Sequence, residues 1–150
     1  MAYADHISEV EWNDRYDWLR KTEVEEAGEW GSILLSPQGV LLSYDLEIAF
    51  CAGAWVSVIV LAHAAIDATI RDTELRDYDS NSKKIFGNDE DLQWLRFVRN
   101  RLVHVSHPDR DSALSEDALG DVAAFQESLE ADARRAVSLV FRSMYANPGT

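Results

Sequence analysis

The sequence predicts an all-α protein, a single domain built as a four-helix up-and-down bundle with an acidic N-terminal helix. Three observations lead to this fold class. The chain has 150 residues, 47% of them hydrophobic, which suits one domain with its own core. Apolar residues recur at intervals of three to four positions over most of the chain, the period of an α-helix. No segment shows a convincing strand pattern.

The first helix is predicted over residues 5 to 29, where acidic residues are mixed with apolar ones at helical spacing: Ile7, Val10, Trp12, Tyr16, Leu19 and Val24. Residues 31 to 43 are predicted to form a loop, because Ser36-Pro37-Gln38-Gly39 interrupts two apolar triplets. A small hairpin is the alternative there. A long second helix, capped by Ser43 or Asp45, is expected to continue to about Arg76.

The third helix is predicted to begin at Asn88 or Asp89, whose side chains can cap it, and to end before Pro108. The fourth is predicted to begin at Ser115 and to keep its apolar period to about Tyr145.

The uncharged run Ile48–Ile66 has the length of a membrane span, but it is rich in alanine and has no basic residues beside it. It is better explained as the central helix of a bundle, so no membrane insertion is expected. The single cysteine, Cys51, lies in this run and should be buried. With no disulfide possible within the chain and no secretory signal at its start, the expected location is the cytoplasm.

Charge is distributed unevenly along the chain. The formal net charge is −13, which argues against a protein that coats nucleic acid in general. Residues 83–110 nevertheless hold six basic residues against four acidic ones, a net of +2, whereas the remainder holds eight against twenty-three, a net of −15. One basic helix is therefore expected within an acidic protein.

The helix in this basic segment is predicted to have two distinct faces. At about 100° per residue, its leucines and valines gather on one side, while Arg96, Asn100, His104 and His107 follow one another on another side. Arg99 falls at the border between the two. The apolar face should pack on the bundle, which leaves the arginine, asparagine and histidine residues to meet a ligand.

The order Arg99-Asn100-Arg101-Leu102-Val103-His104 resembles the signature of the HEPN superfamily of small all-α domains, in which an Arg, often followed by a polar residue such as Asn, is separated from a His by four to six residues. The resemblance covers about residues 43–146. It implies that the signature helix packs on a long apolar helix that carries an acidic residue. Asp67, with Arg71 shortly after it, would supply that acid and a neighbouring base.

The resemblance implies a metal-independent endoribonuclease without a cofactor. Histidine transfers protons near neutral pH, and arginine binds phosphate oxygens. His104 would therefore be the proton carrier, Arg99 the phosphate ligand and Asn100 the orienting group, with Asp67 as a partner of Arg99. Arg71, Arg96, Arg101 and His107 would be supporting residues. Such domains usually dimerise with two signatures facing each other, so the resemblance implies a homodimer that acts on RNA, as a toxin or as a component of defence or regulation.

Several alternatives stay open at this point. The chain could be a non-catalytic HEPN subunit that binds a nucleotidyltransferase-like or antitoxin partner, or an acidic interaction protein that mimics nucleic acid. Arg99 and His104 could also be purely structural. His104, His107 and Asp109 could instead bind a metal, although a fourth ligand is missing. His63, in the apolar run, is predicted to be a core residue.

Overall fold

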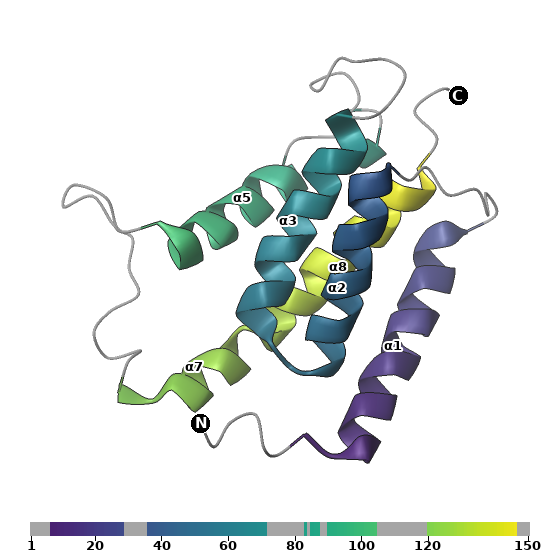
Figure 1. Cartoon of the computed structure of the whole chain (residues 1–150). Helices are drawn as coiled ribbons and strands as arrows, with labels where there is room; N and C mark the ends of the chain where they lie inside the picture. The colour runs from purple at the N-terminus through teal and green to yellow at the C-terminus, as the bar shows by residue number, and fades with distance from the viewer. Residues whose placement is uncertain are drawn as a thin grey trace.

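In the computed structural model, the described residues, 7–28, 36–71, 83, 85–87, 90–104 and 120–146, form six helices and no strand (Figure 1). The all-α class is therefore confirmed for this part of the chain, but the predicted count of four helices is wrong. Two of the expected long helices are each divided by a local break.

Helix α1, Glu9–Ala27, begins with a capping box. The Ser8 hydroxyl accepts a hydrogen bond from the Glu11 amide at 3.1 Å, and the Glu11 carboxylate accepts one from the Ser8 amide at 3.0 Å. The helix is less buried than its apolar pattern predicted, since only Leu19 and Thr22 are buried. Its exposed apolar residues are Val10, Trp12, Tyr16 and Val24.

Helix α2, Pro37–Cys51, occupies much of the segment predicted to be a loop. The Ser36 hydroxyl accepts a hydrogen bond from the Gly39 amide at 2.9 Å, and Pro37 takes the first helical position, where no amide hydrogen is needed. The Ser-Pro pair was therefore a helix start, and the prediction of a loop over residues 31–43 is wrong for its described part, residues 36–43.

The predicted long helix from Ser43 to Arg76 is two antiparallel helices, α2 and α3, Trp55–Arg71 (Figure 1). Gly53 makes the turn between them with a φ of +72°, a left-handed conformation that suits glycine. The uncharged run is thus divided, and no helix in the described part of the chain is both long and apolar enough to cross a membrane. Cys51 is buried, as predicted.

The basic helix is α5, Glu90–Val103, close to its predicted bounds. The predicted fourth helix is divided at Leu129 into α7, Val122–Ser128, and α8, Glu130–Tyr145. Asp121 caps α7 by accepting a hydrogen bond from the Ala124 amide at 3.0 Å. The predicted start at Ser115 lies outside the described residues.

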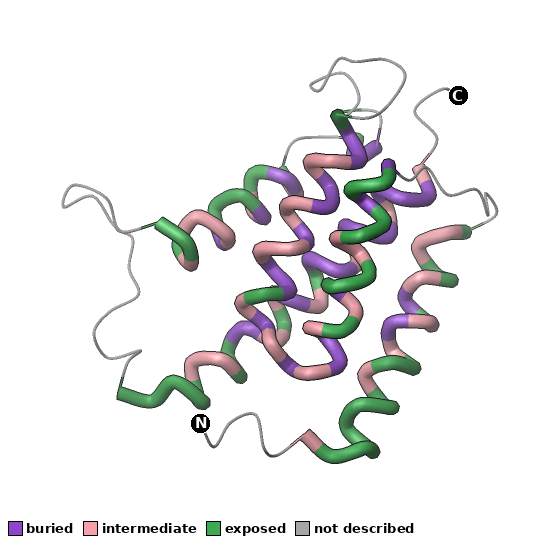
Figure 2. The backbone as a smooth tube through the Cα atoms, in the orientation of Figure 1, coloured by how far each residue is buried: buried purple, intermediate pink, exposed green. Residues whose placement is uncertain are grey.

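The core lies where α3 packs between its neighbours. Helix α3 contacts α2, α8 and α5, and α1 covers α2 and α8 on the outside (Figures 1 and 2). The core includes two stacked rings, Trp18 and Phe50, whose centroids are 5.0 Å apart, and Trp55 meets Phe50 edge-on. Because α5 packs on α3, the position of its polar face is fixed relative to the core.

Candidate functional site

Three buried residues hold α5 on the bundle: Leu92, Leu95 and Val98. They recur at intervals of three, so they occupy one face of the helix. The predicted site residues surround this face. Arg99 and Asn100 are half-buried, whereas Arg96, Arg101 and His104 are exposed. The apolar and polar faces inferred from the sequence are therefore both present.

His104 lies just beyond the end of α5. Its amide donates a hydrogen bond to the Asn100 carbonyl at 3.0 Å, which continues the helical pattern by one residue. The His104 side chain is exposed, one turn after Asn100 at the carboxyl end of the helix. His107 lies outside the described residues.

The arginines of α5 differ from the other described arginines in their partners. Among the residues that the structure describes, Arg96, Arg99 and Arg101 have no hydrogen bond and no ion pair. The remaining described arginines all bind an acid or a backbone carbonyl: Arg15, Arg20, Arg71, Arg134, Arg135 and Arg142. In a chain with 27 acidic residues, these three arginines of α5 therefore keep their guanidinium donors for other partners.

Two polar atoms of this group are buried without a partner among the described residues: Nε of Arg99 and Oδ1 of Asn100. A buried polar atom that makes no hydrogen bond is costly, so each such atom in a folded protein calls for an explanation. Arg99 offers a donor and Asn100 an acceptor, and they are consecutive on one helix. A ligand or ordered water with both a donor and an acceptor would satisfy them.

Helix α3 contributes charged and titratable residues to the same region. Burial, followed by the charge of Arg99, lowers the pKa of His63 below its usual value of 6.5; Asp67 opposes the shift and Arg96 adds to it. His63 is half-buried, so its assignment to the core needs correction: it lies where α3 meets the arginines of α5. In the sequence, His63 precedes Asp67 by four positions, which places both residues on the same side of one helix. This spacing could have indicated that His63 lies with Asp67 near the basic helix.

Asp67 accepts a hydrogen bond from Nε of Arg71 at 2.9 Å, one turn along the same helix. None of the described hydrogen bonds or ion pairs joins Asp67 to Arg99. The predicted acid and base on α3 are therefore paired with each other.

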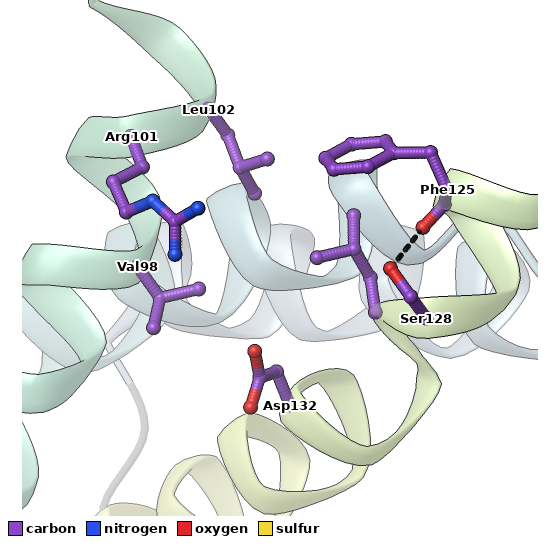
Figure 3. A pocket seen from close by; sticks show the side chains of 7 residues that line it. Val98, Arg101, Leu102, Phe125, Ser128 and Asp132 are labelled. Atoms are coloured by element: carbon purple, nitrogen blue, oxygen red, sulfur yellow. Dashed lines mark hydrogen bonds between the residues drawn. The ribbon is translucent and has the colours of Figure 1, made fainter. Parts of the chain in front are cut away.

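A pocket of about 160 Å³ lies at the C-terminal half of α5, where this helix faces α7 and the start of α8 (Figure 3). Arg101 reaches toward it from α5 and Asp132 from α8, and Phe125 lies at another side. The Ser128 hydroxyl donates to the Phe125 carbonyl at 2.6 Å and so holds the end of α7. The other lining residues are Val98, Leu102 and Leu129.

No cluster of three or more histidine, cysteine, aspartate or glutamate residues that could hold a metal ion is present in the described part of the chain. Two of the three residues in the metal alternative, His107 and Asp109, lie outside that part. The effect of EDTA and zinc on activity therefore tests whether His104, His107 and Asp109 bind a metal.

Comparison of the chain with protein-family models, with curated proteins and with solved structures finds no match. The site is therefore interpreted from its own residues.

Proposed function

We propose that this protein is a metal-independent endoribonuclease of HEPN type, acting in the cytoplasm as a homodimer. The observation that carries the proposal is the set of three unpaired arginines on α5, Arg96, Arg99 and Arg101, in an otherwise acidic protein. An arginine with no acid partner keeps its charge and its donors for a phosphate. These arginines attract RNA phosphates locally, although the formal net charge of −13 repels RNA from the chain as a whole.

The reaction begins with attack of an RNA 2′-hydroxyl on the adjacent phosphorus. A bond forms between the 2′-oxygen and phosphorus, and the bond from phosphorus to the 5′-oxygen breaks. One proton leaves the 2′-hydroxyl and another reaches the departing 5′-oxygen. The products are a 2′,3′-cyclic phosphate and a 5′-hydroxyl, with no water consumed.

Each residue has a defined role in this proposal. His104, exposed at the end of α5, transfers a proton. The Arg99 guanidinium, which has no acid partner among the described residues, stabilises charge on the phosphoryl oxygens. Asn100 orients the imidazole or the phosphate. Because one His104 cannot both take and give a proton in a single step, a second protomer supplies the other histidine.

The supporting residues surround this centre. Arg96 binds a flanking phosphate, Arg101 binds the RNA beside the centre, and His107, three positions after His104 in the sequence, is a further supporting residue. Asp67 and Arg71 form a pair on α3 that borders the site. As a toxin or a component of defence or regulation, the enzyme would act on cellular RNA.

The experiment compares cleavage of a single-stranded RNA by the wild-type chain and by His104→Ala and Arg99→Lys. His104→Ala should lower the rate by about two to four orders of magnitude. Arg99→Lys keeps the positive charge but loses the bidentate geometry of the guanidinium, so this variant should also cleave RNA much more slowly than the wild type.

Two control variants match these changes. Gln93→Ala truncates an exposed polar residue of the same helix, and Arg135→Lys changes an arginine that already binds Asp91 at 3.0 Å. Both should cleave like wild type. If His104→Ala and Arg99→Lys also cleave like wild type, or if activity is lost only with the fold, a non-catalytic partner-binding or acidic interaction protein becomes the better explanation.

A further inference from the structure

The pocket at the end of α5 combines opposite charges that do not neutralise each other. Arg101 and Asp132 both line it, yet neither forms an ion pair with any residue in the described part of the chain. The guanidinium of Arg101 instead lies 5.8 Å from the centre of the Phe97 ring. Donors on one side and acceptors on the other are therefore both left for a ligand.

The remaining walls favour a small planar ligand. Val98, Leu102 and Leu129 are apolar, and Phe125 presents an aromatic ring toward the space (Figure 3). A closed cavity of roughly 150 Å³ accommodates benzene. The present pocket, of about 160 Å³, opens to solvent, so a slightly larger flat ring can enter and project outward. Aromatic side chains stack on nucleobases in single-stranded RNA.

We propose that this pocket is a nucleobase subsite selective for guanine, an inference that rests on the proposed function and gives it a sequence preference. The N1–H and N2–H donors of guanine lie side by side and match the two oxygens of the Asp132 carboxylate. Its O6 and N7 acceptors lie on the neighbouring edge and match the fork of Arg101. Phe125 supports the face of the ring.

Other bases fit this arrangement less well. Adenine places an acceptor, N1, where the carboxylate requires a donor, and its N6 amine would meet the arginine near N7. Uracil offers one donor, at N3, and cytosine places an acceptor there. The carboxylate therefore discriminates by repulsion as well as by attraction.

The pocket is also next to the proposed cleavage centre. Arg101 precedes His104 by three positions, so these two residues lie on the same side of the helix end, whereas Arg99 lies about 200° around α5 from Arg101. A guanine held by Arg101 and Asp132 would therefore lie on the His104 side of the proposed centre. Cleavage should then occur beside guanosine.

Binding is the first test because it does not need catalysis. The probe is a fluorescent uridine heptamer with a central guanosine, 2′-O-methylated throughout so that it cannot be cut, with adenosine and uridine versions for comparison. Fluorescence anisotropy of the full-length chain should show the guanosine probe bound about tenfold or more tightly than the others. Asp132→Asn should abolish this preference, because its amide nitrogen meets the N1–H donor.

The matched control is Glu127→Gln, which makes the same charge change at an exposed residue of α7 outside the pocket. It should keep the guanosine preference. Phe125→Leu should weaken binding of the guanosine probe more than binding of the other two, because it removes the ring that supports the base held in the pocket. Circular dichroism verifies that each variant is folded.

The outcomes separate this inference from the proposed function. Cleavage beside every base, with equal binding of the three probes, overturns the subsite and leaves the nuclease standing. A guanosine preference that depends on Asp132 without any cleavage supports the subsite and overturns the nuclease. A guanosine preference that Asp132→Asn retains also overturns the assignment of this pocket.

Discussion

His63 on α3 lies close enough to Arg99 on α5 for the arginine charge, together with burial, to lower the pKa of the histidine. The contact between these two helices therefore joins a titratable residue to the arginine of the proposed centre. At neutral pH the imidazole of His63 is uncharged, so a phosphate arriving at Arg99 meets one permanent cation and one neutral ring.

This relationship predicts how His63 titrates. An NMR titration of its ring should give a pKa below 6.5, and Arg99→Gln should raise that pKa because a repelling charge is removed. Arg101→Gln should leave it nearly unchanged, since Arg101 is not among the causes of the shift. An equal response to both variants would contradict the placement of His63 beside Arg99.

The same shift predicts a pH dependence of stability. Above pH 6.5 the ring is neutral in both folded and unfolded chains, so it has no effect on stability. Below pH 6.5 the unfolded chain binds the proton more strongly, and stability falls until the folded pKa is passed. Thermal unfolding between pH 7.5 and 5.5 should therefore show a smaller loss for His63→Gln than for wild type. Parallel pH profiles would count against this expectation.

The chemistry of the proposed reaction predicts its products and requirements. Cleavage should persist in EDTA and should leave a 2′,3′-cyclic phosphate and a 5′-hydroxyl, which mass spectrometry of the fragments identifies. A 2′-deoxy nucleotide at the cut position should block the reaction, because the attacking oxygen is gone. Activity lost in EDTA and restored by zinc would instead favour the alternative in which His104, His107 and Asp109 bind a metal.

A catalytic site formed by residues of two protomers predicts that the protein is a homodimer in solution. Light scattering at tens of micromolar should give a mass twice the 16.9 kDa of the chain. Adding an excess of His104→Ala protein to the wild type should lower the activity per wild-type chain, because each mixed dimer then has only one of the two histidines that the reaction needs. A strictly monomeric protein that still cleaves RNA would exclude the two-protomer mechanism.

The contact between α1 and α8 predicts a local effect on stability. The Tyr145 hydroxyl donates to the Glu23 carboxylate at 2.5 Å, and burial together with this bond raises the pKa of Tyr145 to about 12. Tyr145→Phe should lower the free energy of unfolding by about 1 to 2 kcal/mol, because Glu23 keeps Arg20 at 2.9 Å as a partner. Denaturant unfolding measures the loss, and ultraviolet titration checks the pKa.

Much of the helical architecture was determined by the sequence alone. The approximate bounds of α5, the burial of Cys51 and the two faces of α5 follow from local rules, because they depend on helical periodicity and on residues a few positions apart. The predicted caps of α5, Asn88 and Asp89, lie outside the described residues. The combination of arginine, asparagine and histidine on one helix is likewise visible in the printed sequence.

The breaks in the long helices were harder to predict. Ser36-Pro37 reads equally well as a turn or as a helix start, and Gly53 in an apolar run can be tolerated within a helix or can end one. The packing of α2 back on α3 decides between these possibilities, because burying both apolar faces stabilises the turn. The exposure of Val10 and Val24 on α1 is also a tertiary result, since α1 contacts its neighbours with a narrower face than its composition suggested.

Only the tertiary structure placed His63 beside Arg99 and brought Asp132 to the pocket that Arg101 lines. Each pair joins residues more than thirty positions apart, and no local periodicity specifies such a distance. The sequence determined which chemical groups this protein has and on which helices they lie. The packing of α5 on α3, with α7 and α8 across the pocket, decided which of them share a site, because long-range proximity is set by the burial of apolar faces that the polar residues themselves do not control.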